Sequence, residues 1–547
     1  MHSIEITGSQ ALAYGAIEAA VAYVTGYPGS PATGVVDALL ALAGEGMRIE
    51  WAVNEKSAYD AAFGASLAGA RSLLCLKSVG LNVALDSLMV SNLAAGDGGF
   101  VILVGDDPGG WGSQNEEDSR PLVAAAEVPL LEPATLHDAQ RVMVRAFALS
   151  EQFRVPVAVR ITRALAAEKA PYQPPPPPTP PGSRQGPLER QGPLERQGDR
   201  FNVLPVHVVE FHRELHRAVD GVQALFEASD LNRREGEGKQ GVIAAGYAYR
   251  KLAEVLSRSG HPPLPVLGLS TIHPLPEQRI ARFLRNLDAA LVLEETAPYV
   301  EIQVQALAQR AGLMLPVYGR LSGHVPREGE LFEGQLANAL GALLPEWPWP
   351  AFGPGGRAMP SRQPLCEDCP YVPTFEALLA VMGRHGGRDA FVVTGETGCM
   401  VRSQLPPFEL LDVKYGMGSS IGLAAGLART GLPQSIVALS GDSAMLHSGL
   451  AELIDAAQAG IGLLVVILAN ETTALSGGQP HPATAHDARG AARQPVDLAA
   501  LAQAAGADSV RVVDPEDRQA TEAALEEGLA PGKLAVVIAR RACPRWE

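Results

Sequence analysis

An acid and an amide stand near the two ends of the stretch GDSAMLHSGLAELIDAAQAGIGLLVVILANETT, which runs from Gly441 to Thr473. SIVALSGDS has the pattern of a buried strand that ends in a turn at Asp442, and GLAELIDAAQAG that of a helix. IGLLVVILANETT follows as a second strand, with Asn470 in its exit loop. Carboxylate and amide oxygens are hard ligands that suit Mg²⁺ bound together with phosphate groups. The sequence therefore predicts a cation site, and two unrelated loop residues are the alternative.

A parallel sheet is the element that would bring these two side chains together. The carboxyl ends of parallel strands meet at one edge of a sheet, where ligands bind. DAFVVTGETGC and KLAVVIARR add further strand-like runs to the same segment. We therefore expect a doubly wound α/β domain over residues 362–547. In this domain, glycines and the helix N-terminus after Ser443 would receive diphosphate oxygens.

The first part of the chain shows the same alternation. ALAYGAIEAAVAYV and ATGVVDALLALAG have helical patterns, and RSLLCLKS and GGFVILVGDD are short apolar runs, which together indicate a parallel sheet covered on both faces. A polyproline stretch with a tandem RQGPLE repeat then indicates an extended linker, and a second α/β segment follows it. The predicted divisions are residues 1–168, a linker at 169–200, residues 201–348, and residues 362–547.

Composition excludes several classes of protein. A chain of 547 residues exceeds one ordinary core, and 47% hydrophobic with 5% aromatic residues favours helices packed on buried strands. A formal charge of −16 argues against nonspecific nucleic-acid binding. The odd count of 5 cysteines suits a reducing compartment. With neither a secretory signal pattern nor an apolar run of about 18 residues, we expect a cytoplasmic protein that does not enter a membrane.

The longest motifs cover nearly the whole chain apart from the linker. They include VTGYPGSP, WAVNEKSAYDAAFGASLAGARSLLCLKSVGLNVALDSLM, GDDPGGWGSQNEEDSR, LVLEETAPYVEIQV, LCEDCPY, YGMGSSIGLAAGLA and NETTALSGGQPHP. These motifs resemble the alpha subunit of indolepyruvate:ferredoxin oxidoreductase, in the thiamine-diphosphate-dependent 2-oxoacid oxidoreductase family. The resemblance implies a multidomain α/β thiamine-diphosphate-binding fold. A pyrimidine-binding domain would come first, a transketolase C-terminal-like domain second, and a diphosphate-binding domain last.

The resemblance also implies roles for individual residues. Asp442, Asn470 and the main-chain carbonyl of Thr472 would hold Mg²⁺. Glu55 would hydrogen-bond the pyrimidine ring so that this ring removes the thiazolium proton, whereas an ordinary first helical turn after an Asn54 cap is the alternative. His447 is the second catalytic candidate. The other implied cofactor-binding residues are Gly29, Gly416, Met417, Gly418, Ser419, Gly441 and Ser443, and the implied substrate residues are Lys77, Asn82, Gln114, Asn115 and His481.

The implied reaction is oxidative decarboxylation of an aryl 2-oxoacid, of the indolepyruvate or phenylpyruvate type, to an acyl-CoA and CO₂. Coenzyme A would be the cosubstrate, and a smaller gamma-type (beta) subunit and a separate electron acceptor would be the partners. The implied assembly is a dimer of alpha subunits or a heterotetramer.

The end of the sequence and the residue at position 371 depart from the family pattern. Family alpha subunits continue into a ferredoxin-like domain with Cys-rich motifs, whereas this sequence ends at ACPRWE with Cys543. Cys366 and Cys369 form a CxxC without a second pair, which is weak support for zinc. We therefore expect no iron–sulfur cluster in this chain. Tyr371 also replaces a usual His.

Two alternative functions stay open at this point. A non-oxidative 2-oxoacid decarboxylase or carboligase would need no electron acceptor. A catalytically silent scaffold subunit would retain only the fold.

Overall fold

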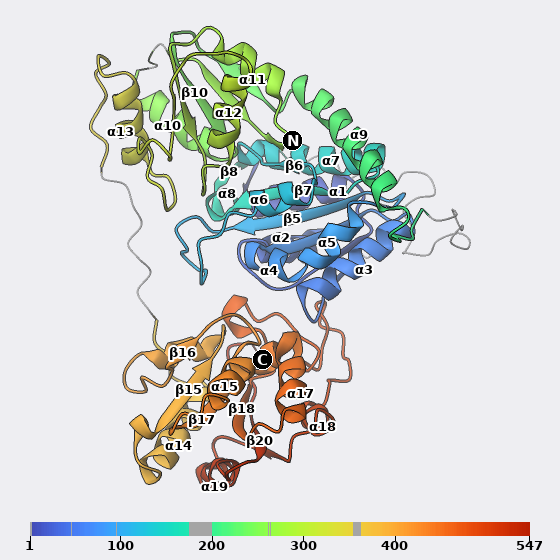
Figure 1. Cartoon of the computed structure of the whole chain (residues 1–547), viewed down its shortest axis with the longest axis vertical. Coiled ribbons are helices and arrows are strands. Elements are labelled where there is room, and N and C mark those ends of the chain that lie inside the picture. Colours follow the sequence, from blue (N-terminus) through green and yellow to red (C-terminus); the bar gives the residue numbers. More distant parts are fainter. Residues whose placement is uncertain are drawn as a thin grey trace. The chain divides into compact units, whose positions relative to one another are not determined.

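The computed structural model describes residues 3–44, 46–94, 96–173, 200–260, 262, 264–353 and 363–546 (Figure 1). The chain divides into two compact units, Met1–Glu50 with Glu55–Met359, and Trp51–Asn54 with Pro360–Glu547. Most of the predicted linker at 169–200 lies outside the described residues. Within the described residues, no helix combines the length and hydrophobicity that a membrane span requires.

A seven-stranded sheet organises the N-terminal part of the first unit, in the order β12-β6-β7-β5-β4-β2-β3. Strands β2, β4, β5, β7 and β6 pair in parallel, and β12 joins β6 antiparallel. Strands β5 and β7 are buried along their whole length, as expected for strands covered on both faces. The bounds are β2 Tyr23–Gly26, β3 Arg48–Trp51, β4 Ser72–Lys77, β5 Phe100–Asp106, β6 Leu130–Leu131, β7 Val157–Thr162 and β12 Thr271–His273.

Short helices alternate with these strands. A capping box starts α1, because the Thr7 hydroxyl accepts from the Gln10 amide and the Gln10 side chain accepts from the Thr7 amide. Strand β1 (Ile4–Thr7) pairs antiparallel with β8 (Lys169–Tyr172), which falls in the segment predicted as linker. The helices are α1 Gly8–Glu18, α2 Thr33–Leu42, α3 Glu55–Leu67, α4 Ser78–Val83, α5 Leu85–Ser91, α6 Arg120–Ala125, α7 Leu136–Phe153 and α8 Arg163–Ala167.

The second part of this unit contains a five-stranded sheet in the order β14-β13-β10-β11-β9. Strand β9 joins β11 antiparallel and the other pairs are parallel. Since β12 belongs to this half of the chain yet extends the first sheet, the two halves share one compact unit. The bounds are β9 Arg233–Glu235, β10 Gln240–Ala245, β11 Val266–Leu269, β13 Ala289–Leu293 and β14 Val317–Tyr318, with α9 Val208–Glu227, α10 Ala248–Arg258, α11 Glu277–Leu284, α12 Tyr299–Arg310 and α13 Glu333–Leu343.

The second unit is built on a parallel six-stranded sheet in the order β16-β15-β17-β18-β20-β19. Alternate residues of β17 and β18 enter two different core clusters, one packed by α14 and α19 and the other by α15, α17 and α18. The predicted α/β class with doubly wound parallel sheets is therefore confirmed. The strands are β15 Phe391–Gly395, β16 Val413–Lys414, β17 Ser435–Gly441, β18 Leu463–Ala469, β19 Ser509–Val513 and β20 Leu534–Arg540, and the helices are α14 Tyr371–Arg384, α15 Ser420–Ala428, α16 Asp442–Ala444, α17 Leu450–Gln458, α18 Leu498–Ala504 and α19 Arg518–Gly528.

Candidate active site

Three neighbouring strands of the second unit end in buried polar residues. Glu396 follows β15, Asp442 follows β17, and Asn470 follows β18. The register pairs Gly441 with Leu468, so β17 and β18 end at nearly the same level of the sheet. Ligands of open α/β sheets bind at this edge.

Asp442 lies against the loop that begins at Asn470. Its Oδ1 accepts a hydrogen bond from the Ser443 amide at 2.8 Å, and its Oδ2 accepts one from the Glu471 amide at 2.7 Å. Glu471 adopts a left-handed backbone with φ of 61°, a conformation that bends the chain sharply after the strand. The Nε2 atom of His481 lies 3.3 Å from Asp442 Oδ2. His481 was predicted to contact substrate, and the structure places it beside the predicted metal ligand.

The donor set around Asp442 fits a hard divalent cation. Asp442, Asn470 and Thr472 are each less than a tenth exposed. Among the described residues, the Asn470 Oδ1 atom accepts one hydrogen bond, at 3.4 Å from the Thr472 amide, so it retains capacity for a ligand. Beyond its 3.3 Å contact with Asp442 Oδ2, the buried Nε2 atom of His481 has no hydrogen-bond partner among the described residues. A carboxylate and an amide oxygen suit Mg²⁺.

The predicted Gly416–Ser419 segment forms a tight turn before α15. Gly418 has φ of 74°, and a Cβ built there would lie 2.0 Å from Ser448 Oγ, so only glycine fits. Ser448 Oγ donates to the Met417 carbonyl at 3.1 Å, and Ser419 Oγ donates to the Gly416 carbonyl at 2.7 Å. The turn is therefore held against the helical segment that follows Asp442.

Glu396 is a buried carboxylate in this group that the sequence analysis did not single out. Its Oε1 accepts from Ser440 Oγ at 2.7 Å and from the Gly441 amide at 2.9 Å. Burial raises the pKa of Glu396 to about 7, although hydrogen bonds from Ser440 and from the amides of Gly441, Gly418 and Ser420 oppose the rise. Glu396 thus joins the predicted cofactor turn to the end of β17. The signal was present in GETGC, where an acid follows a strand just as it does in SGDS.

A π-helical turn, Met445–Gly449, interrupts the helix that starts at Asp442 and continues as α17. His447, the second catalytic candidate, lies within this turn and is buried. Its Nδ1 lies 3.1 Å from Ser448 Oγ. Such turns occur frequently at functional sites because they displace side chains from regular helical positions.

Four cysteines line one cavity of about 220 Å³ next to this site. Cys366 and Cys369 precede α14, Cys399 follows β15, and Cys543 follows β20. Asn470 lines the same cavity, and its carbonyl accepts a hydrogen bond from the Cys543 amide at 3.1 Å. Burial raises the pKa of the Cys369 and Cys399 thiols to about 11, so both are neutral near pH 7 without a metal.

The expectation of no iron–sulfur cluster was based on the spacing of cysteines along the chain. The fold nevertheless brings four cysteines to one cavity. Among the described residues, no three of these sulfurs lie within 4.8 Å of one another. Zinc would hold thiolates about 3.8 Å apart, given Zn–S bonds of about 2.3 Å in a tetrahedron. The four sulfurs are therefore too widely separated, as they stand, for one tetrahedral zinc ion.

Tyr371, at the position where the family usually has His, is a buried core residue. Its hydroxyl donates to the Leu468 carbonyl at 3.3 Å, and its ring packs on Phe375 with centroids 6.1 Å apart. These contacts tie the start of α14 to the end of β18.

In the first unit, Glu55 begins α3 and is buried. It packs so closely on α4 that a Cβ at Gly80 would lie 2.7 Å from Glu55 Cγ. Gly29 packs in the same manner on Lys77, whose Cβ would lie 2.8 Å from a Cβ at Gly29. Lys77 is the last residue of β4, and burial lowers its pKa, an effect that nearby Asp107 opposes.

The loop at 107–118 carries most of the remaining substrate candidates. Asn82 and Asn115 both donate to Glu117 Oε2, at 3.1 and 3.3 Å, and the side chains of Asn82, Gln114 and Asn115 are exposed. Lys77 Nζ donates to the Gly112 carbonyl at 3.2 Å. The structure therefore groups Lys77, Asn82 and Asn115 around one loop, at the carboxyl edge of the seven-stranded sheet.

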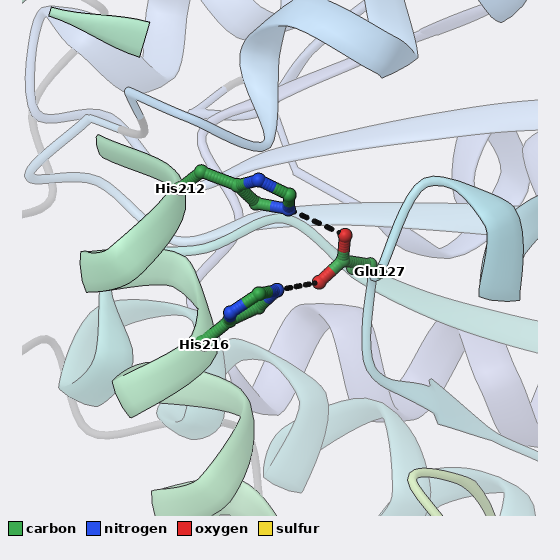
Figure 2. A group of neighbouring side chains, drawn as sticks. All are labelled: Glu127, His212 and His216. Atoms are coloured by element: carbon green, nitrogen blue, oxygen red, sulfur yellow. Dashed lines mark hydrogen bonds and ion pairs between the residues drawn. The ribbon is translucent and has the colours of Figure 1, made fainter. Parts of the chain in front are cut away.

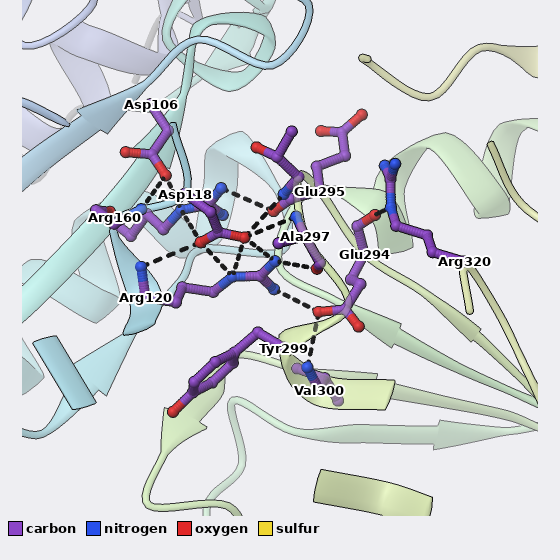
Figure 3. Close-up of polar contacts among 12 residues, drawn as sticks. Asp106, Asp118, Arg120, Arg160, Glu294, Glu295, Ala297, Tyr299, Val300 and Arg320 are labelled. Atoms are coloured by element: carbon purple, nitrogen blue, oxygen red, sulfur yellow. Dashed lines mark hydrogen bonds and ion pairs between the residues drawn. The ribbon is translucent and has the colours of Figure 1, made fainter. Parts of the chain in front are cut away.

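Buried ion pairs anchor the end of this loop to the second sheet of the unit (Figure 3). Arg120 is fully buried, and it contacts Asp118 at 2.5 Å and Glu294 at 2.8 Å. Asp118 Oδ2 also accepts from the Ala297 amide at 2.8 Å. Burial alone would raise the pKa of Asp118, but the charges of Arg120 and Arg160 outweigh it and hold the pKa well below its usual range.

A second set of contacts anchors the middle of the loop. Trp111 Nε1 donates to Glu330 Oε2 at 2.9 Å, and Glu116 Oε1 accepts from the Gly329 amide at 2.7 Å. Glu330 is in turn 3.0 Å from Lys251. We call these contacts, with the Asp118–Ala297 hydrogen bond, the loop clasp.

Comparison with known proteins identifies the family. Residues 396–539 match the thiamine pyrophosphate enzyme C-terminal TPP-binding domain, and residues 14–224 match the thiamine-diphosphate-binding region of pyruvate flavodoxin/ferredoxin oxidoreductases. The indolepyruvate oxidoreductase subunit IorA of Thermococcus kodakarensis is 33% identical over 99% of this chain and 86% of its own length. The chain belongs to the IorA family. The IorA subunit of Archaeoglobus fulgidus is likewise 33% identical, over 98% of this chain and 86% of its own.

Among solved structures, a 2-oxoglutarate:ferredoxin oxidoreductase from Magnetococcus marinus superposes with a TM-score of 0.45 at 17% identity, over 58% of this chain and 62% of that one. The family assignment depends on the IorA sequences alone. As a member of the IorA family, the chain is a thiamine-diphosphate-dependent 2-oxoacid oxidoreductase. Its matched C-terminal region begins at Glu396 and contains Asp442, Asn470 and the Gly416–Ser419 turn.

Proposed function

We propose that this chain is the thiamine-diphosphate-binding subunit of an enzyme that converts an aryl 2-oxoacid, of the indolepyruvate or phenylpyruvate type, and coenzyme A to an acyl-CoA and CO₂. Two electrons leave the substrate in the reaction and pass to an acceptor on a partner protein. The names of the IorA relatives support the substrate class. They also describe those proteins as subunits, which supports a heteromer with a smaller gamma-type (beta) subunit.

The observation that carries the proposal is the convergence of Asp442, the Asn470 loop and His481 at the ends of two parallel strands. Asp442, Asn470 and the Thr472 carbonyl would hold Mg²⁺, which binds the diphosphate. Gly441, Ser443 and the Gly416–Ser419 turn would line the cofactor. When bound, thiamine diphosphate supplies a nucleophilic carbon for attack on the 2-oxo group. His481 would then orient Asp442 rather than contact substrate.

The first unit would supply the groups that act on the pyrimidine ring and on the substrate. Glu55 would hold a proton at its carboxyl oxygen in a hydrogen bond to a ring nitrogen. Lys77 would bind the substrate carboxylate, since a partly desolvated ammonium interacts strongly with an anion. Asn82 of α4, with Gln114 and Asn115 of the 107–118 loop, would lie beside the substrate, and His447 would hold or release a proton on the substrate oxygen.

The four cysteines would provide a route by which electrons leave the site. Cys366, Cys369, Cys399 and Cys543 would hold an iron–sulfur cluster, which would supply a one-electron acceptor next to Asn470. Anaerobic reconstitution with iron and sulfide tests this directly. We expect a reducible, EPR-active cluster in the wild type and loss of its iron in Cys399→Ser. Cys75 is a buried cysteine outside the cavity, and Cys75→Ser is the matched control that keeps the cluster.

The function itself is tested by CO₂ release from indolepyruvate, phenylpyruvate and 2-oxoglutarate, with the partner subunit present. Oxidative decarboxylation requires coenzyme A and an electron acceptor such as an oxidised viologen dye, so omitting the dye should abolish acyl-CoA formation. Acceptor-independent formation of an aldehyde would instead identify the non-oxidative decarboxylase. A protein that fails to bind thiamine diphosphate in the presence of Mg²⁺ would be the silent scaffold.

A further inference from the structure

Two histidines on helix α9 and one glutamate from a different element meet at the surface of the first unit (Figure 2). His212 and His216 are four residues apart, so both imidazoles lie on one face of the helix. This is the interval at which the helical H-E-x-x-H motif presents two zinc ligands. Here the carboxylate comes from Glu127, in the turn between α6 and β6.

The carboxylate of Glu127 spans the two rings. Its Oε1 lies 2.6 Å from His212 Nε2, and its Oε2 lies 2.8 Å from His216 Nε2. The Glu127 backbone is left-handed, with φ of 55°, a conformation that non-glycine residues adopt rarely. The three ligand atoms all lie within 4.8 Å of one another, and no other group of His, Cys, Asp or Glu in the described part of the chain meets this condition.

We propose that Glu127, His212 and His216 form a binding site for a borderline divalent metal ion, with Zn²⁺ as the ion tested. Two imidazole nitrogens and one carboxylate oxygen are a donor set that zinc accepts, whereas Mg²⁺ and Ca²⁺ prefer oxygen ligands alone. Zinc would replace the protons on the two Nε2 atoms, and each nitrogen would then lie about 3.4 Å from the bound carboxylate oxygen. The side chains of His212, His216 and Glu127 are 46%, 57% and 32% exposed, so water can complete the coordination.

The bound ion would fasten the start of α9 to the first sheet. In the first half of the helix, only Leu215 is buried, whereas Val222 and Phe226 hold the second half. The ion would replace the contacts of His212 and His216 with Glu127 by coordinate bonds, and so strengthen the attachment of this half of α9 to the turn that leads into β6. We therefore expect the metal to stabilise the N-terminal half of α9 locally, and this site is independent of the thiamine-diphosphate reaction.

The experiment measures zinc binding to the full chain after chelator treatment, with thiamine diphosphate and Mg²⁺ present. The wild type should bind one equivalent of zinc more than the double variant His212→Ala/His216→Ala, and Glu127→Gln should weaken this equivalent at least tenfold. The matched control is His385→Ala. His385 has the same 2.6 Å contact to a carboxylate, Glu526, but lacks a second histidine beside it. His385→Ala should therefore bind zinc as the wild type does.

Hydrogen exchange of the wild type gives a readout that needs no variant. Zinc should slow amide exchange in residues 208–216 and 124–130, and leave α19, which carries Glu526, unchanged. Equal zinc binding by the wild type and the double variant would overturn the proposal. So would zinc binding that leaves exchange in α9 unaltered, because the ions would then occupy the cysteine cavity or another site.

Discussion

At the scale of single residues, the candidate active site depends on carboxylates that hold main-chain amides. Asp442 accepts from the amides of Ser443 and Glu471, and Glu396 accepts from that of Gly441. Each hydrogen bond fixes a loop at the end of a strand, so removing a carboxylate changes the shape of the site as well as its charge. Two substitutions separate these effects.

Asp442→Asn should weaken binding of thiamine diphosphate in Mg²⁺ at least tenfold. The amide has the same size but no charge for the cation, and its NH₂ group cannot accept from the Glu471 amide. Isothermal titration calorimetry measures the affinity. Asp455→Asn, on the exposed surface of α17, is the control that binds as the wild type does. An unchanged affinity in Asp442→Asn would remove Asp442 from the metal site.

Glu396→Gln should reduce the pH dependence of stability in the cofactor-free protein. The folded pKa of about 7 lies above the ordinary value of 4.5, so the folded state binds the extra proton between these two pH values. Wild-type stability therefore falls as the pH rises through this window, by up to about 3 kcal/mol, and is level above it.

Glutamine cannot ionise, so the difference in melting temperature between about pH 5 and about pH 8 should shrink in this variant. Glu376→Gln, at an exposed position of α14, should retain the wild-type difference. A Glu396→Gln variant that also retained it would show that Glu396 does not titrate with a raised pKa.

At the scale of elements, the loop clasp holds the 107–118 loop beside Lys77. The Trp111 indole donates to a carboxylate, and such hydrogen bonds contribute about 1.5–3 kcal/mol. Within the loop, Ser113 Oγ donates a 2.6 Å hydrogen bond to Asp107.

Trp111→Phe should raise the KM for the 2-oxoacid about tenfold while leaving the affinity for thiamine diphosphate unchanged. Phenylalanine can keep the aromatic contact with Phe332 but loses the N–H donor. Steady-state kinetics with the partner subunit measure the effect. The control is Trp347→Phe, which removes an indole hydrogen bond to the Ser259 carbonyl, away from the loop. Equal effects of the two substitutions would mean that the clasp has no specific role.

At the scale of the whole molecule, the first unit is held together by charges buried between its two halves. Arg120 of α6 reaches Glu294, and Arg160 of β7 reaches the Glu295 carbonyl (Figure 3). A buried charge that loses its partner is far more costly than a small cavity. A single substitution in an apolar core therefore destabilises the unit less than one that removes a buried charge.

Arg120→Met should destabilise the first unit by about 3–5 kcal/mol, because Asp118 and Glu294 then lose their compensating charge. Hydrogen exchange in residues 294–300 and in α12 measures this locally. Arg511→Met breaks an ion pair with Glu527 in which both side chains are about half exposed, and it should cost less than about 1 kcal/mol. Comparable losses in the two variants would contradict the role given to burial.

The sequence contained enough information for part of the site. The approach of Asp442 to the Asn470 loop follows from the rule for parallel strands, because both residues stand directly after apolar runs. The same rule applies to Glu396, which also follows a strand. It was not predicted as a site residue because the GETGC motif showed no other feature that indicates a binding site. The pairing of His212 with His216 was readable from helical spacing.

Other parts of the site depend on contacts between distant segments, which no local pattern encodes. Glu127 meets His212 only through packing of α9, Trp111 meets Glu330 across two sheets, and Cys543 reaches the other cysteines only because β20 lies beside β18. Cysteine spacing therefore could not predict this cavity, since spacing measures distance along the chain and not in space.

The buried ion pairs of the first unit also constrain how related sequences can diverge. A chain that loses Arg120 retains two buried acids, so the next tolerated change is one that neutralises Asp118 or Glu294. In a large set of relatives, these three positions should therefore vary together, as a charged set or as an apolar one. Such covariation would mean that the 107–118 loop and the β13–α12 turn change together among related sequences, although the two are far apart in sequence.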